Sequence, residues 1–156
     1  MFCDEKITKR TGGMIDVSLK KENKRIAKAQ ATVKLKKEVL DIIKNNKAFK
    51  GDVLECARIA AISASKKTSD LIPLCHPLRI TEVKISFVFI KDGIRIRSLV
   101  SAIERTGVEM EAMVACSVCA LTIYDMCKMY DRSIEITDIM LIEKQGGKNG
   151  IYKRER

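Results

Sequence analysis

The sequence predicts an α+β fold in which helices pack on one face of an antiparallel sheet. Segments with the periodicity of strands and of helices follow one another along the 156 residues in the order β-α-α-β-β-α-β. Apart from one doubled helix, this order is the split βαβ, or ferredoxin-like, pattern. The pair Asp92–Gly93 stands between two alternating segments and is typical of a β-hairpin, so the two strands that it joins are expected to be antiparallel.

The first half of the chain is expected to form one strand and two helices. Residues 29–35 (AQATVKL) alternate small or apolar side chains with polar ones, as a half-buried strand does. Residues 36–46 have the apolar spacing of an amphipathic helix. A second helix is predicted over residues 51–67, with Asp52 as its N-cap. Its apolar set is expected to be Leu54, Ile59 and Ile62.

The second half is expected to form a hairpin, a long helix and a final strand. The hairpin strands are residues 81–90 and 94–103, and apolar side chains on both faces of the first strand favour an oligomer. Residues 108–130 are rich in helix formers, and a strand over residues 134–144 follows them. The sequence QGGKNG (145–150) is then expected to be flexible.

The length predicts a single domain over residues 14–156, preceded by a flexible arm over residues 1–13. No apolar segment approaches the ~20 residues needed to span a bilayer. The first residues, MFCDEKITKRTGG, lack the apolar region of a secretory signal. We therefore expect a cytoplasmic protein without a membrane partner, in which the six cysteines are reduced.

Basic residues are concentrated at the two ends of the chain, which has a net charge of +10. Lys and Arg outnumber Asp and Glu by 14 to 6 in residues 1–50 and by 5 to 1 in residues 144–156, whereas residues 51–143 have 11 against 13. Basic ends suit nucleic acid, one polyanionic small molecule, or simply a soluble surface. Charge alone leaves these three alternatives open.

The sequence LIPLCHPL (71–78) contains both prolines and the only histidine of the chain. Pro73 and Pro77 fix their own φ and bias the residues before them toward extended conformations. His76 is therefore expected to be held rigidly in a loop, as a titratable group in a site is. Cys75 precedes it, and neighbours in an extended segment point opposite ways, so the pair is not expected to chelate a metal.

Two further motifs favour structural interpretations when they are taken alone. The C-x-x-C of Cys116 and Cys119 lies within the long helix and provides only one pair of ligands, so we interpret it as core packing and expect no metal site. The glycines of residues 145–150, with Lys144 and Lys148, would let phosphates approach the backbone. Their order is not that of a P-loop, and a flexible tail remains the alternative.

Charged residues of the long helix raise a geometric question. Asp125 and Lys128 are three residues apart and share one helix face. Glu109 and Glu111 are roughly 200° apart around the axis, so we expect that they do not both face one pocket. Glu111 and Asp125 are roughly 21 Å apart along the axis. If both belong to one site, that site is expected to lie between two chains.

Seven stretches together resemble a known family, that of molybdenum cofactor biosynthesis protein C, the cyclic pyranopterin monophosphate synthases. They occur in the family's order and span almost the whole chain after residue 13. Ser69 stands where relatives often have an aromatic residue, and the hairpin sequence also differs. The stretches are MIDVS (14–18), KGDV (50–53), ARIA (57–60), KKTSDLIPLCHPL (66–78), TGVEMEA (106–112), ALTIYDMCK (120–128) and KQGGKNG (144–150).

The resemblance implies an enzyme with a ferredoxin-like fold. Its substrate would be 3′,8-cyclo-7,8-dihydro-GTP, and its products cyclic pyranopterin monophosphate and pyrophosphate. It also implies a hexamer, a trimer of dimers, with sites at subunit interfaces. No cofactor is expected to be required, although Mg²⁺ is a possible companion of the substrate triphosphate.

The resemblance also implies roles for individual residues. Asp125 is the main acid/base candidate, with Lys128 and Lys50 as further proton carriers. Lys128 would either hold Asp125 ionised or, with a lowered pKa, act as an acid. The remaining residues are expected to bind substrate. Those around its ring system are Leu74, Cys75, His76, Met110 and Glu111, and those around its triphosphate are Arg25, Lys66, Lys144 and Lys148. Glu109 is a further substrate-binding candidate.

Two other classes of protein were weighed against the enzyme. A basic nucleic-acid-binding module has the same order of strands and helices, but it requires aromatic residues on the central strands. Residues 94–103 contain none, so we expect no nucleic-acid partner. A purely structural oligomer predicts that Asp125 and Lys128 can be replaced without loss of any property other than assembly.

Overall fold

The computed structural model describes residues 12–155, which form one sheet and four helices. Of the predicted arm 1–13, only Gly12 and Gly13 lie within the described residues, and both are exposed. The strands are β1 (Asn23–Lys34), β2 (Ile80–Ile90), β3 (Gly93–Glu104), β4 (Glu135–Gly147) and β5 (Gly150–Lys153). The helices are α1 (Lys37–Lys44), α2 (Val53–Ser65), α3 (Thr68–Leu71) and α4 (Glu109–Cys127).

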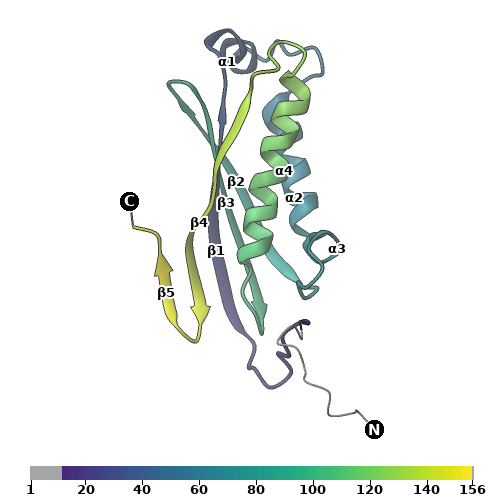
Figure 1. The fold of residues 1–156 in the computed structure, drawn as a ribbon, viewed down its shortest axis with the longest axis vertical. Helices are drawn as coiled ribbons and strands as arrows, with labels where there is room; N and C mark the ends of the chain where they lie inside the picture. Colours follow the sequence, from purple (N-terminus) through teal and green to yellow (C-terminus); the bar gives the residue numbers. More distant parts are fainter. Residues whose placement is uncertain (1–11, 156) are drawn as a thin grey trace, which may run out of the picture.

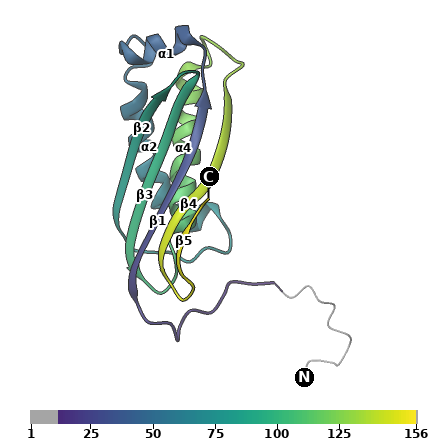
Figure 2. The ribbon, with the colours of Figure 1, turned by 90° about the vertical axis from the view of Figure 1, so that its left-hand side faces the viewer.

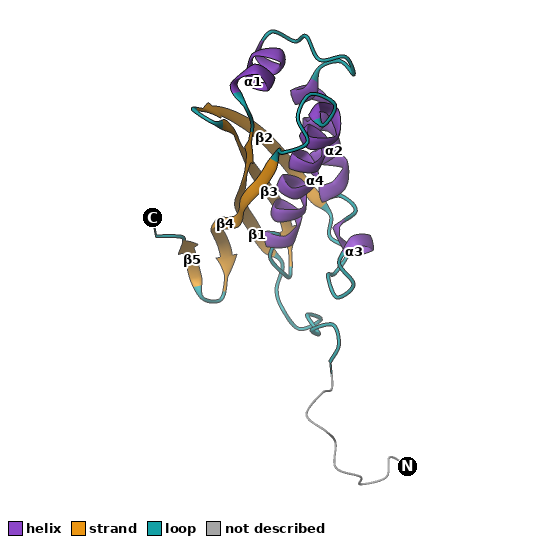
Figure 3. Cartoon of the chain, turned by 45° about the horizontal axis from the view of Figure 1, so that its top comes forward, coloured by secondary structure: helices purple, strands orange, loops and turns teal. Residues whose placement is uncertain are grey.

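The strands form an antiparallel sheet in the order β2-β3-β1-β4-β5. Helices α2 and α4 lie on one face of it (Figure 1), and no described helix covers the other face (Figure 2). Helix α1 lies at one end of the molecule and α3 at the other (Figure 3). The predicted ferredoxin-like α+β fold is therefore confirmed, with α3 and β5 as elements that the sequence did not reveal.

Strand β1 runs through the centre of the sheet and is longer than predicted. It begins at Asn23 rather than at residue 29 and pairs with β3 along its whole length. The first residues of β1 lack an alternating apolar pattern, because the buried Arg25 occupies a position that faces the helices. The start of the strand was therefore not predicted. The other positions on that face, together with those of β3, form the core: Ala27, Ala29, Ala31, Val33, Ile94, Ile96, Val100 and Ala102.

Small side chains allow the two long helices to approach each other closely. The predicted N-cap of α2 is confirmed, since Asp52 accepts a hydrogen bond from the Glu55 N–H at 3.0 Å. The prediction for Ile59 was wrong, because its side chain is 58% exposed. The buried stripe of α2 is instead made of Val53, Ala57, Ala61 and Ala64. Leu54 and Ile62 pack against this core and are partly buried, as predicted. Only Ile59 was misplaced, because a stripe of alanines has little hydrophobic contrast.

Helix α4 is the central core helix. By length and composition it is apolar enough to cross a membrane, but here it packs against the sheet and α2. Cys116 and Cys119 are completely buried in it, which confirms their interpretation as core residues. Burial raises the pKa of the Cys116 thiol to about 11 and that of the Cys119 thiol to about 12. Both thiols therefore stay protonated near neutral pH.

The sequence QGGKNG is part of a hairpin, so the prediction that it is flexible was wrong. Residues up to Gly147 continue β4, and a two-residue turn leads into β5 at Gly150. Gly146 and Gly150 have φ of 93° and 73°, a region that side chains disfavour. A Cβ atom on Gly146 would lie 2.1 Å from the Lys24 carbonyl oxygen. These glycines serve a tight turn and a close approach of two strands.

Replacing Ile123 by Ala is expected to lower the free energy of unfolding by about 2–5 kcal/mol, because its side chain is fully buried in α4 and its loss leaves a cavity. Urea denaturation measures this loss. The same substitution at Ile151, which is 63% exposed in β5, provides the matched control and should cost less than about 1 kcal/mol. Equal losses at the two positions would contradict this assignment of the core.

Candidate active site

The loop after α3 and the start of α4 enclose a cavity of about 270 Å³, here called the histidine cavity. Its wall contains Ile15 and Val17 from the segment before β1. It also contains Thr106 and Gly107, which precede α4. The five residues that the resemblance assigned to the ring system of a substrate line it, and so does the further candidate Glu109: Leu74, Cys75, His76, Met110, Glu111 and Glu109.

Glu109 and Glu111 both line this cavity, so the prediction that they cannot face one pocket was wrong. The prediction assumed a pocket on the flank of a regular helix. Helix α4 begins at Glu109, with Val108 as its N-cap, and the cavity lies over this end. Side chains that leave the first turn at different angles can reach the same space beyond a helix terminus.

Glu111 is the buried titratable group of the cavity, with only 3% of its surface exposed. Burial is the main cause that raises the pKa of its carboxyl to about 7, and the charge of Glu109 contributes to that value. A carboxyl with this pKa exchanges protons readily near neutral pH. Burial also raises the pKa of the Cys75 thiol, which agrees with a role for Cys75 as part of the wall.

A second cavity, of about 840 Å³, lies beside the β4–β5 turn and is here called the glycine cavity. Arg25, Lys144 and Lys148 line it together with the glycines of the turn. The two cavities adjoin, since Glu109 lines both and its carboxylate pairs with Lys144 at 2.7 Å. The glycine cavity is therefore cationic and contiguous with the histidine cavity.

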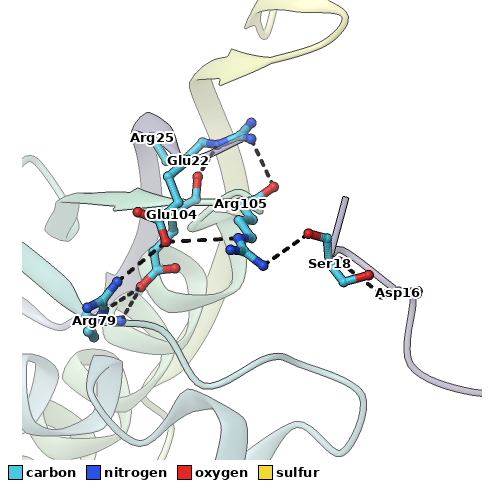
Figure 4. Close-up of polar contacts among 7 residues, drawn as sticks. All are labelled: Asp16, Ser18, Glu22, Arg25, Arg79, Glu104 and Arg105. Atoms are coloured by element: carbon cyan, nitrogen blue, oxygen red, sulfur yellow. Dashed lines mark hydrogen bonds and ion pairs between the residues drawn. The ribbon is translucent and has the colours of Figure 1, made fainter. Parts of the chain in front are cut away.

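Arg25 shapes the glycine cavity by holding three segments together (Figure 4). Its Nε donates to the Glu104 carbonyl oxygen at 3.1 Å, and its Nη2 donates to the Arg105 carbonyl oxygen at 3.0 Å. Its Nη1 donates to the Gly146 carbonyl oxygen. The ends of β3 and β4 are thereby fixed to β1. The guanidinium has protein partners and adds positive charge to the wall.

A third group of candidates forms a cluster at the other end of α4. Asp125 lies between two lysines, with Oδ1 2.7 Å from Lys128 Nζ and Oδ2 2.9 Å from Lys50 Nζ. The hydrogen bonds from Lys128 and Lys50 lower the pKa of Asp125 to about 2. Asp125 in turn raises the pKa of Lys128. Of the two roles considered for Lys128, this arrangement favours the one in which it holds Asp125 ionised.

The structure does not bring all of the predicted residues together. Helix α4 separates the lysine–aspartate cluster (Lys50, Asp125 and Lys128) from the histidine cavity, as its length predicted. Lys66 is exposed at the C-cap of α2 and lines neither cavity.

Several residues that line the cavities were not predicted from the sequence. Lys20 lines both, while Lys21 and Arg105 line the glycine cavity. The available signal was position, because Lys20 follows the MIDVS stretch and Arg105 precedes TGVEMEA. No sequence pattern separates Lys20 from the other lysines of this basic segment. Its position beside both cavities is seen only in the folded structure.

A model of the MoaC family matches residues 14–147. The chain belongs to the MoaC family. This range includes the lysine–aspartate cluster and all predicted residues of the two cavities except Lys148. The family assignment thus confirms the resemblance seen in the sequence stretches.

Three members of the MoaC family illustrate the similarity. The cyclic pyranopterin monophosphate synthase of Novosphingobium aromaticivorans is 51% identical over 143 residues, which cover 92% of this chain and 91% of that protein. The enzyme of that name from Desulfitobacterium hafniense is 50% identical over 143 residues, or 91% and 88% of the two chains. Cyclic pyranopterin monophosphate synthase 1 of Mycobacterium tuberculosis is 50% identical over 142 residues, or 90% and 84%.

Replacing Glu111 by Gln is expected to remove a pH-dependent loss of stability. The folded carboxyl has a pKa of about 7 against an ordinary value of 4.5, so the folded state binds more protons between these values. Wild-type stability therefore falls as the pH rises through this window, by at most about 3 kcal/mol. Urea denaturation midpoints should be measured for both proteins from pH 4.5 to pH 8. The midpoint of Glu111→Gln should rise relative to that of the wild type as the pH increases to about 7.

Asp125→Asn is the matched control for this titration. It is also a change from carboxylate to amide, but the pKa of Asp125 is about 2, so its effect should be constant across the same range. An advantage of Glu111→Gln that is equal at pH 5 and pH 8 would contradict a raised pKa in the folded protein.

Proposed function

We propose that this chain is a cyclic pyranopterin monophosphate synthase, a lyase of molybdenum cofactor biosynthesis. It converts 3′,8-cyclo-7,8-dihydro-GTP to cyclic pyranopterin monophosphate and pyrophosphate. Relatives at 50 to 51% identity across about nine-tenths of the chain have this name. The structural observation that carries the proposal is the pair of adjoining cavities, one with hydrogen-bonding groups for a ring system and one with cations for a triphosphate.

The histidine cavity suits a guanine-derived ring system. A carboxylate accepts two hydrogen bonds from the N–H edge of such a ring, and Glu111 is placed to do so. His76 provides a group that donates or accepts a proton. Leu74, Cys75 and Met110 supply the wall around it.

The glycine cavity suits the triphosphate. Lys144 and Lys148 supply charge beside glycines, which let phosphate oxygens approach the backbone, and Arg25 adds a third cation. Such cations stabilise the negative charge that develops when pyrophosphate leaves. We assign the exposed Lys66 to the same polyanion because it stands in the family-like stretch 66–78, although it lines neither cavity.

The lysine–aspartate cluster is the proposed proton-transfer centre. The reaction opens one ring, closes the pterin and pyran rings, and joins a sugar-derived hydroxyl to the α-phosphate, and each step moves protons. Asp125 stays ionised near neutral pH and holds Lys128 and Lys50 in place. Asp125 is then available to accept a proton, Lys128 keeps it ionised, and Lys50 is the candidate proton donor.

We further propose that the chain acts as a homo-oligomer, a hexamer built as a trimer of dimers, with each site between subunits. The histidine cavity and the lysine–aspartate cluster lie at opposite ends of α4, so one chain does not present both to one small substrate. Phe49, beside Lys50, is 83% exposed, and Leu121 and Met129 are exposed near Asp125. These apolar side chains support a protein contact around the cluster.

The uncovered face of the sheet supports the same assembly. It is hollowed by a groove of about 1090 Å³ lined by Gln30, Arg97 and Met140, among others. We propose that a second subunit fills this groove.

The remaining expectations follow from the same function. We propose a cytoplasmic enzyme without a resident cofactor, in which any Mg²⁺ accompanies the substrate triphosphate. Strands β1 and β3 contain no Phe, Tyr or Trp, so the sheet offers no platform for stacking bases. This observation favours the enzyme over a nucleic-acid-binding module.

Turnover is the direct test of the proposal. The purified protein should release pyrophosphate and the pterin product from 3′,8-cyclo-7,8-dihydro-GTP, and Asp125→Asn should lower kcat by about 100-fold or more, because it removes the group that accepts a proton. Asp92→Asn, in the exposed hairpin turn, is the control and should retain wild-type activity. Absence of product from the folded wild-type protein would overturn the proposal.

A mixing experiment tests whether the site is shared between chains. His76→Ala and Asp125→Asn are each expected to be inactive, but their damaged residues lie at opposite ends of α4. Oligomers formed from both variants would contain some sites with neither substitution, and activity should return to a fraction of the wild-type level. Mixed oligomers that are verified by mass and remain inactive would show that each site belongs to one chain.

A further inference from the structure

The junction between the two cavities contains a cation that has no assigned role. Four residues line both the histidine cavity and the glycine cavity: Lys20, Thr106, Gly107 and Glu109. Of these four, only Lys20 is positively charged. Glu109 is negative and already paired with Lys144 at 2.7 Å. Whatever ligand occupies both cavities therefore passes Lys20 at the point where one cavity meets the other.

The position of Lys20 is fixed by the backbone before β1. The Lys20 N–H donates to the Val17 carbonyl oxygen at 3.0 Å, which closes a turn. The Ser18 N–H donates to Asp16 Oδ1 at 2.9 Å, and Arg105 Nη1 donates to the Ser18 carbonyl oxygen at 3.1 Å (Figure 4). The turn is thereby attached to the loop that enters α4.

The side chain of Lys20 is exposed and takes part in no ion pair with another described residue. Other charged residues of the segment interact with protein groups. Glu22 lies 3.6 Å from Arg79 and 4.0 Å from Arg105, and the buried Arg25 donates to three carbonyl oxygens. Lys20 thus combines a fixed backbone with an ammonium group that is available to a ligand.

We propose that Lys20 is a catalytic residue that binds the α-phosphate of the substrate, the phosphate that is retained and cyclised. This inference rests on the proposed function, in which the ring system lies in the histidine cavity and the triphosphate in the glycine cavity. The α-phosphate is the phosphate attached to the sugar, so of the three phosphates it lies nearest the junction of the two cavities. Lys20 is the one residue there whose charge suits it.

A contact between Lys20 and the α-phosphate would stabilise charge during the phosphoryl-transfer step. The oxygen of a sugar-derived hydroxyl forms a bond to the α-phosphorus, and its proton leaves to a base of the site, assigned above as Asp125. The bond from the α-phosphorus to the oxygen shared with the β-phosphate breaks, and the electron pair leaves with pyrophosphate. Negative charge develops on the oxygens around the α-phosphorus, where the Lys20 ammonium stabilises it.

Lys20→Met and Lys21→Met form a matched pair of variants. Both remove one exposed lysine from adjacent positions, but Lys21 lines only the glycine cavity. Lys20→Met should lower kcat by about 100-fold with a smaller change in KM. Lys21→Met should act mainly on KM, and Lys20→Arg should restore part of the lost kcat. Equal effects of the two methionine variants, or an effect of Lys20→Met on KM alone, would overturn the proposal.

Binding of simple probes tests the contact without turnover. The wild type should bind GMP more tightly than guanosine, because GMP carries the α-phosphate alone. Lys20→Met should reduce that preference about tenfold, whereas Lys21→Met should retain it and lose only part of the further gain from GMP to GTP.

The two measurements separate this proposal from the proposed function. If the wild-type protein fails to turn over substrate but shows the expected preference for GMP, the proposed function is wrong and the proposed phosphate contact is supported. If the wild type turns over substrate but binds GMP no more tightly than guanosine, the proposed contact is wrong and the proposed function is supported. The same conclusion follows if neither variant loses the preference for GMP.

Discussion

The packing of α4 against the centre of the sheet is the constraint on which the rest of the molecule depends. Its buried small side chains, among them Cys116 and Cys119, bring it into close contact with α2, β1 and β3. A helix held along its whole length in a close-packed core does not bend to bring its ends together. Glu111 at one end and Asp125 at the other are therefore fixed apart, and the proposed shared site follows from that rigidity.

The carboxyl groups at the two ends of this helix have their pKa values shifted by different causes. At the first, burial keeps the pKa of Glu111 near neutrality, so its proton is easily exchanged. At the second, two lysines keep Asp125 ionised in a largely solvated cluster. One carboxyl is tuned by the removal of water and the other by neighbouring charge. Two environments thus give two acidic side chains opposite protonation behaviour within one short domain.

The glycine cavity owes its shape to backbone contacts far apart in the sequence. Arg25 fixes the ends of β3 and β4 through three carbonyl oxygens, and Gly146 allows β4 to approach Lys24 closely. The positive charge that was visible in the composition is thereby concentrated on one wall. Basic residues of both chain ends meet there because β1 and β4 are neighbours in the sheet.

Local periodicity and turn chemistry depend on adjacent residues, so they predicted the order of the main strands and helices, the antiparallel hairpin at Asp92–Gly93 and the core role of the C-x-x-C. The family resemblance was also present in the sequence. Three features became visible in the folded chain alone: α2 buries alanines rather than Ile59, Glu109 and Glu111 share a cavity, and Lys20 lines two cavities. Those outcomes depend on which distant segments meet, and packing between elements sets this rather than any local pattern.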